Sequence, residues 1–313
     1  MENRLYKYDN IKAILIFLVV FGHFLERVVG CNLLYLTIYS FHMPLFMFVS
    51  GYFARFDREK IFLKMIYPYI LFQILYTYYE IYVLHNTQIA LTFTRPVWLL
   101  WYLFALIVYH LLLELFDVRQ KQIRKFMMVI VVIVALMSGY DTVMGYDFSA
   151  SRIITFMPFF LAGFYWRKEE KNVGMQKNYW WIVICSVILS VCTAFILEKC
   201  NITGEMLYGS LSYKYGNYNA VLKLLIMVIA AAWIGMFVIL MPNKRVPFLT
   251  EIGRYTMPVF LLHGFVVKQV NEISPAGAVG FSLVLVVLLG NRYANKIFEM
   301  IFTGRWMAKL FHQ

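Results

Sequence analysis

Long apolar stretches alternate with short polar connections along almost the whole chain. A helix needs about 20 mostly apolar residues to cross the hydrocarbon core of a bilayer, and ten stretches approach or reach that length. The fifth and sixth are short for a full crossing, which suggests little tilt or an end within the protein. The ten predicted spans cover residues 11–29, 33–54, 61–84, 97–116, 126–140, 152–166, 179–198, 219–241, 248–270 and 278–301.

The basic residues between these stretches favour one orientation. Cytoplasmic loops carry an excess of Lys and Arg, and here such residues gather before the first stretch, in every second connection and after the last stretch. This alternation predicts ten spans with both chain termini in the cytoplasm. The basic groups are Arg4, Lys7 and Lys12; Arg55, Arg58, Lys60 and Lys64; Arg119, Lys121, Arg124 and Lys125; Arg167, Lys168, Lys171 and Lys177; Lys244 and Arg245; and Arg292, Lys296, Arg305 and Lys309.

Composition indicates the same class of protein. Of the 313 residues, 62% are hydrophobic and 15% are charged, whereas soluble domains are roughly 45–50% apolar and about 25% charged. We predict an all-α, polytopic membrane protein that forms a single domain over residues 1–313. The net charge of +12 does not indicate nucleic-acid binding, because the cations lie in separate short clusters that suit loops facing anionic headgroups. No Cys or His spacing is typical of a zinc site, so no metal is predicted.

Two ionisable residues mark one face of the first predicted span. Lys12 and His23 are eleven residues apart, which is close to three helical turns and corresponds to about 16 Å along the axis. They therefore predict a groove with a cation at its cytoplasmic mouth and an imidazole toward the outer half. Gly22 lets a backbone or ligand approach His23 closely, and Glu26 lies one turn further on, where it could orient the ring.

A buried histidine such as His23 also has structural explanations, either as a hydrogen-bonded core residue or as part of span packing. Ionisable groups at membrane depth are costly and by default mark function, and histidine takes and returns protons near neutral pH. We therefore predict that His23 is catalytic and that Glu26 acts with it, and we keep the structural role as the alternative.

Two further histidines accompany proline breaks. In "SFHMPLFMFVSGYF", His42 precedes Pro44, and in "YTMPVFLLHGF", Pro258 precedes His263. Proline removes a backbone donor and frees the carbonyl one turn earlier. Since His42 could satisfy such a carbonyl, both a structural role and a substrate-binding role stay open for it.

Five stretches, taken in order, resemble the integral-membrane acyltransferase 3 family, and in particular its short branch of fucose 4-O-acetylase-like proteins. The resemblance runs from about residue 8 to residue 270. Each piece alone is weak, but five in the family's order are specific. They are "YDNIKAILIFLVVFGHF", "FHMPLFMFVSGYF", "VWLLWYLFAL", "PFFLAGFYWRK" and "IGRYTMPVFLLHGF".

The resemblance implies a ten-span enzyme that moves an acyl group, usually acetyl from cytosolic acetyl-CoA, onto a sugar or another hydroxyl acceptor at the outer face. The family signature of a basic residue, ten intervening residues and a histidine falls on Lys12 and His23. It implies acid–base or acyl-relay chemistry at the histidine. The basic residue would serve the donor side or support the histidine.

The remaining site assignments follow from this reading. Arg55 and Arg58 lie near the same predicted mouth and would attract the CoA phosphates together with Lys12. We assign substrate binding to His42, Trp98 and His263. The expected partners are the lipid bilayer, an acyl-CoA and a glycan or other hydroxyl acceptor, and the expected location is the bacterial cytoplasmic membrane.

The chain departs from the family at one motif. Larger members carry a Trp-Ser-x-Ser-x-Glu stretch where this chain reads "VWLLWYLF", which keeps Trp98 and replaces the polar positions by Leu99, Trp101 and Leu103. The carboxylate expected there is missing. The substitutes left open are Glu26, Glu80, Asp9 and Asp141, or none.

Two other functions compete with the transferase. A small secondary transporter would use the broken helices to frame a midplane site, but it does not explain the alignment of Lys12 with His23. A non-catalytic subunit that handles glycans would tolerate the loss of His23.

Overall fold

The computed structural model describes residues 5–142, 147–169, 179–215 and 217–304, and over these ranges the chain is helical, without a strand. The predicted positions of both termini, and the basic residues Lys171 and Lys177, lie outside the described residues. Within them, seven helices are long and apolar enough to cross a membrane: Tyr6–Leu25, Asn32–Phe53, Arg58–Tyr82, Lys121–Tyr140, Asp147–Glu169, Trp180–Lys199 and Ala220–Leu240.

The other three predicted spans are shorter or broken. The fourth and ninth correspond to apolar helices of 10–17 residues, Trp98–Leu111 and Thr256–Val267. The tenth, predicted as a span over 278–301, is bent: α15 (Pro275–Leu289) and α16 (Arg292–Phe302) meet at an angle of 71°, which makes the pair a broken span or a re-entrant loop. Asn291 causes α16 to begin anew, since its side chain accepts hydrogen bonds from two backbone N–H groups of the first turn.

The fifth and sixth predicted spans are not short, contrary to the expectation. They form helices of 20 and 23 residues, Lys121–Tyr140 and Asp147–Glu169. The apolar stretch underestimates each helix because polar and basic residues at the ends continue the hydrogen-bonded helix beyond it. The sequence therefore located these elements but misjudged their length.

Both predicted proline breaks are present. The second span divides into α2 (Asn32–Tyr39) and α3 (His42–Phe53), and the ninth region divides into α13 (Pro247–Arg254) and α14 (Thr256–Val267). In α3 and in α14 the proline stands in the first turn, where a backbone N–H has no intrahelical partner to lose. In each case the first helix ends four or five residues before the proline, and the next helix begins two residues before it.

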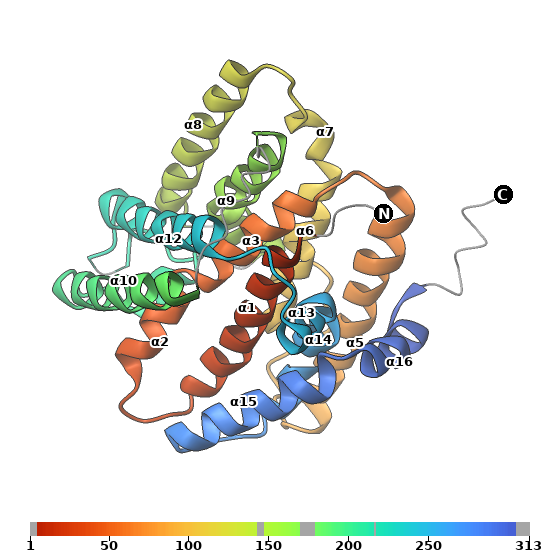
Figure 1. The fold of residues 1–313 in the computed structure, drawn as a ribbon. Helices are drawn as coiled ribbons and strands as arrows, with labels where there is room; N and C mark the ends of the chain where they lie inside the picture. Colours follow the sequence, from red (N-terminus) through yellow and green to blue (C-terminus); the bar gives the residue numbers. More distant parts are fainter. Residues whose placement is uncertain (1–4, 143–146, 170–178, 216, 305–313) are drawn as a thin grey trace.

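Helix α1 (Tyr6–Leu25) lies inside the bundle and packs against α3, α13, α14 and α15 (Figure 1). Helix α9 (Ala150–Glu169) covers α3 on another side and is itself covered by α8 (Lys121–Met137). Helices α10 (Tyr179–Lys199) and α12 (Ala220–Leu240) pack on each other at the edge. Large apolar side chains are exposed on α8, α10 and α15, as expected of surfaces that face lipid.

The remaining helices complete the bundle and the connections. They are α4 (Arg58–Ile61), the π-helical turn η1 (Phe62–Ile66), α5 (Tyr67–Tyr82), the 3₁₀ turn η2 (Trp98–Leu100), α6 (Trp101–Leu111), α7 (Leu113–Phe116), the 3₁₀ turns η3 (Ser138–Tyr140) and η4 (Asp147–Ser149), and α11 (Gly204–Leu207).

Candidate active site

Three polar side chains meet where α1 ends and α2 ends. His23 lies in the last turn of α1, and its Nδ1 is 3.3 Å from Oε1 of Glu26, the residue that follows the helix. The Tyr39 hydroxyl lies 2.9 Å from the same Nδ1 and donates a hydrogen bond of 2.5 Å to the same carboxylate oxygen. The predicted pairing of Glu26 with His23 is therefore present, and Tyr39 joins it.

These contacts determine which nitrogen of His23 carries the proton. Partial burial raises the pKa of the Glu26 carboxyl, but the hydrogen bond and charge of His23, the Tyr39 hydroxyl and nearby Arg27 outweigh it and lower the pKa below its ordinary value. Glu26 is then a carboxylate, which only accepts hydrogen bonds. His23 Nδ1 must donate to it, so Nε2 of the neutral ring is left as the basic nitrogen.

Gly22 makes room for this network. A Cβ atom at position 22 would lie 2.9 Å from Cε2 of the Tyr39 ring, closer than side-chain carbons approach one another. The sequence predicted a close approach at Gly22, and the structure shows that the ring of Tyr39 makes it. The break after Tyr39 ends α2 at this point and directs the ring toward α1.

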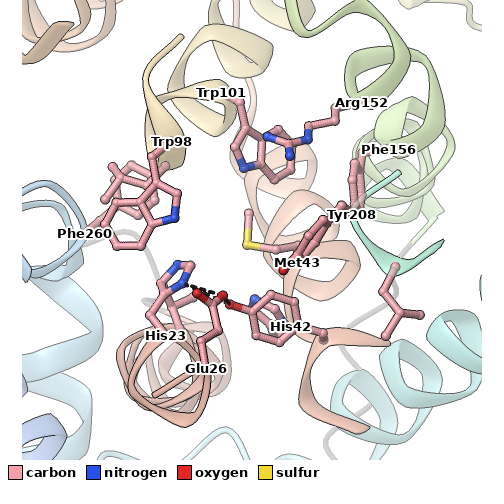
Figure 2. Close-up of a pocket in the computed structure, with 14 residues that line it drawn as sticks. His23, Glu26, His42, Met43, Trp98, Trp101, Arg152, Phe156, Tyr208 and Phe260 are labelled. Atoms are coloured by element: carbon pink, nitrogen blue, oxygen red, sulfur yellow. Dashed lines mark hydrogen bonds and ion pairs between the residues drawn. The ribbon is translucent and has the colours of Figure 1, made fainter. Parts of the chain in front are cut away.

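His23 lies at the wall of an aromatic cavity (Figure 2). The cavity has about 770 Å³ of empty space, part of it open to solvent. Its walls come from α1, α2, α3, η2, α6, α9, α14 and the segment around α11. The lining residues are Val19, His23, Glu26, Tyr39, His42, Met43, Trp98, Leu99, Trp101, Arg152, Phe156, Leu207, Tyr208 and Phe260. Such a site, largely apolar with a few convergent polar groups, is typical of small-molecule binding.

Trp98 forms the wall beside His23 in a strained conformation. Its backbone φ is +46°, a region that non-glycine residues rarely adopt and that costs about 1–3 kcal/mol. The centres of the Trp98 and His23 rings are 4.6 Å apart. The ammonium of Lys268 lies 4.8 Å from the centre of the Trp98 ring. Gly264 leaves the space that the indole fills, since a Cβ there would lie 2.6 Å from Trp98 Cζ3. Trp98 thus lines the cavity, and its role in substrate binding stays a prediction.

The two other predicted substrate-binding histidines occupy different places. His42 lines the cavity, and its Nδ1 donates a 2.8 Å hydrogen bond to the carbonyl of Ile38. His263 is fully buried and donates similarly to the carbonyl of Val259 at 2.9 Å. Its ring stacks 5.5 Å from that of His23, behind the cavity wall, and it is not among the lining residues. The structure thus places His263 against His23 and not among the lining residues, and its role in substrate binding stays a prediction.

Lys12 is not among the residues that line the cavity around His23. Lys12 forms an ion pair of 3.0 Å with Asp9, whereas the described cavity reaches only as far as Val19 along α1. Leu15 and Ile16, which lie between them, are completely buried. The predicted continuous groove is therefore wrong for this conformation, because helix phase aligned the two residues but side chains from neighbouring helices fill the space.

The predicted donor-side cations lie at the Lys12 end of the bundle. Arg58 begins α4 and is exposed. Arg55, also exposed, lines a separate pocket of about 1100 Å³ together with Arg167 and Lys168. Asp9, the partner of Lys12, also lies 3.9 Å from Nε of Arg254 on α13.

The geometry selects one of the carboxylates that the sequence left open. Glu80 forms a buried ion pair with Lys268 and accepts a hydrogen bond from Asn86. Asp9 pairs with Lys12, and Asp141 does not line the cavity. Glu26 is therefore the carboxylate beside His23.

Several residues of the site were not predicted from the sequence. Tyr39 lies on α2, across a helix break from His42, and no spacing within one helix links it to His23. Arg152 and Tyr208 reach the cavity from α9 and from the end of α11, far away in the chain. No local pattern marks them, because their contribution depends on how the helices pack.

The fold and the site together define a multi-pass membrane protein with a histidine–carboxylate pair at the wall of an aromatic cavity. Residues 5–290 match the family described as acyltransferase domain, so the chain belongs to this family of membrane acyltransferases. It is also similar to nodulation protein NolL from Sinorhizobium fredii, with 47% identity over 60 residues. That match covers 17% of this chain and 16% of the relative. No solved structure matches the chain.

Proposed function

We propose that the protein is an O-acyltransferase of the bacterial cytoplasmic membrane. It moves an acyl group, in the simplest case acetyl, from a cytosolic acyl-CoA to a hydroxyl of a cell-surface glycan or related acceptor. The observation that carries this proposal is the arrangement of His23, whose Nδ1 proton is held by Glu26 and Tyr39 at the wall of an aromatic cavity. Membership of the acyltransferase family supplies the type of reaction.

The proposed chemistry uses Nε2 of His23 as a general base. It takes the proton of the acceptor hydroxyl while the hydroxyl oxygen forms a bond with the thioester carbonyl carbon. The carbon–sulfur bond then breaks, and the CoA thiolate recovers the proton from the imidazolium. The Glu26 carboxylate stabilises the positive ring that forms between these steps. A covalent acyl-His23 intermediate is the other route within the same class.

The cavity walls suit a sugar acceptor. Trp98, Trp101 and Tyr208 line the cavity, and the apolar face of a sugar ring can pack against aromatic rings of this kind. His42 adds a polar edge to the same wall. These features support a glycan hydroxyl as acceptor.

On the donor side, Lys12, Arg55 and Arg58 would attract the phosphates of CoA by charge. Because Leu15 and Ile16 are fully buried between Lys12 and the cavity, delivery of the thioester along α1 requires these side chains to move. Donor binding would then be coupled to an opening of the bundle at this end.

We also propose that ten segments cross the membrane, with the Lys12 end in the cytoplasm. The alternation of basic connections supports this orientation. Cysteines introduced at Asn86 and Asn217 should react with a membrane-impermeant thiol reagent in intact cells. Protection of either position until the cells are lysed would contradict the orientation.

The decisive experiment follows labelled acetyl from acetyl-CoA in membranes that contain equal amounts of wild-type protein or His23→Gln. Gln keeps a hydrogen-bonding side chain but cannot accept the proton, so the rate should fall by roughly 10²–10⁴, the usual contribution of general acid–base catalysis. Near-normal transfer by His23→Gln would exclude His23 as the base. A non-catalytic glycan-handling subunit would show no transfer in either form.

A further inference from the structure

Arg152 is a cation inside the cavity that the reaction proposed above does not use. It lies in the first turn of α9, and its guanidinium stands 5.3 Å from the Trp101 ring and 6.0 Å from the Tyr208 ring. Figure 2 shows it beside Trp101, across the cavity from His23 and Glu26, with Met43 between them in this view. Its charge therefore belongs to a different part of the cavity from the base.

The guanidinium of Arg152 is chemically suited to a planar anion. Its N–H donors lie in the plane of the group, at its edges. Those donors match the two oxygens of a carboxylate or phosphate. Tyr208 is itself held by a 2.6 Å hydrogen bond between its hydroxyl and that of Tyr35, which fixes one of the two rings.

A negative charge, the carboxylate of Glu26, lies on the side of the cavity opposite Arg152. Among the lining residues Glu26 is the one carboxylate, and it is engaged with His23 and Tyr39. An anionic ligand is repelled from Glu26 and attracted to Arg152, so the cavity orients a ligand that carries charge at one end. The uncharged end, with its hydroxyls, then comes to His23.

We propose that the acceptor carries an anionic group, a carboxylate or a phosphate, that Arg152 binds while a hydroxyl on the opposite side of the acceptor reaches His23. This inference rests on the proposed function for the meaning of "acceptor", but the binding preference itself does not require catalysis. It makes Arg152 a residue that determines specificity and the position of acylation.

Binding of two matched sugars to the full-length protein in detergent tests the preference. Methyl β-glucuronide and methyl β-glucoside differ only in the carboxylate at carbon 6, and binding is followed by thermal stabilisation and by the fluorescence of the cavity tryptophans. The glucuronide should bind about 10- to 100-fold more tightly, the usual range for a charge-assisted contact. Inorganic phosphate and a phosphorylated sugar, measured in parallel, distinguish a phosphate-bearing ligand from a uronate.

Arg152→Gln should remove the discrimination, and Arg152→Lys, which keeps the charge but loses the planar donors, should retain part of it. Arg95→Gln is the matched control, because Arg95 is 66% exposed, pairs with Asp147 and does not line the cavity; its preference should equal that of the wild type. Thermal unfolding without ligand shows whether each variant is folded. If Arg152→Gln does not fold, Arg152→Lys still tests whether the preference for the glucuronide depends on Arg152.

The outcomes separate this inference from the proposed function. Equal affinity for both sugars, no binding of any anionic probe, or full discrimination by Arg152→Gln overturns the inference. Discrimination that depends on Arg152 supports it even if the acetyl-transfer assay fails, in which case only the proposed function falls. A preference for the phosphate-bearing probes identifies phosphate as the anionic group.

Discussion

The two ends of α1 carry similar sequence signals but differ in packing. At the His23 end, α2 stops at Tyr39 and Trp98 adopts a left-handed backbone, and a cavity remains between the helices. At the Lys12 end, the apolar side chains of Leu15 and Ile16 are completely buried. An unbroken helix packs continuously against its neighbours, whereas a helix end leaves space for polar groups. Irregular backbone is tolerated in membrane proteins where it lines a cavity, and Tyr39 and Trp98 illustrate this at the His23 end.

The largest effect should come from the carboxylate that distinguishes the His23 end. Glu26→Gln places an amide donor near Nδ1 and favours the tautomer with the proton on Nε2, so the acyl-transfer rate should fall roughly 100-fold, within the range of general base catalysis. Tyr39→Phe removes one hydrogen bond and should lower the acyl-transfer rate about tenfold. The assay is labelled acetyl transfer at matched expression.

The control for Glu26→Gln is Glu272→Gln, because Glu272 is an exposed carboxylate outside the cavity. It should transfer acetyl at the wild-type rate. Unchanged activity in Glu26→Gln would show that His23 does not need the Glu26 carboxylate to hold the proton on Nδ1.

The difference in packing predicts a difference in accessibility. In a variant whose four native cysteines are replaced, Val19→Cys should react with a small thiol reagent at least about tenfold faster than Ile16→Cys, since transiently exposed groups react in proportion to the open population. If the donor opens the Lys12 end, adding acetyl-CoA should raise the rate at position 16. Equal labelling at both positions without donor would show that the groove is already continuous.

Gly22 tests the tight packing at the His23 end. Gly22→Ala places a methyl group 2.9 Å from the Tyr39 ring, so the ring must shift and the transfer rate should fall several-fold, up to about the tenfold expected for the loss of the Tyr39 hydrogen bond. Gly280→Ala is the matched control, because nothing lies within 4 Å of a Cβ at that position. It should keep full activity and unfold at the same or a slightly higher temperature, since Ala favours a helix more than Gly does. Equal activity of the two variants would mean that Tyr39 is not needed close to α1.

The smallest effect is expected at Lys12. Its side chain is 23% exposed and pairs with Asp9, and contacts of partly exposed charges are worth about 0–1 kcal/mol. Lys12→Ala should therefore raise the KM for acetyl-CoA at most about fivefold with little change in kcat, and Lys12→Arg should be milder. A loss of kcat comparable to that of His23→Gln would instead place Lys12 in the chemistry.

The sequence alone determined the helical architecture, most of the long apolar helices, both proline breaks and the positions of His23 and Glu26 within one helical turn. These are local properties, because the spacing of apolar residues and the missing donor of a proline act over one or two turns. Helix ends were less accurate: the pattern cannot show that Asn291 starts a new helix at 71° to α15.

Only the tertiary structure decided which residues meet. It brought Tyr39 to His23 and Glu26, paired Glu80 with Lys268 instead, and placed Arg152 across the cavity. It also filled the space between Lys12 and His23, although their helical phase is nearly the same. Helical phase fixes the direction of a side chain on its own helix, but whether that direction faces a cavity or a neighbouring side chain depends on the packing of helices that are distant in the chain.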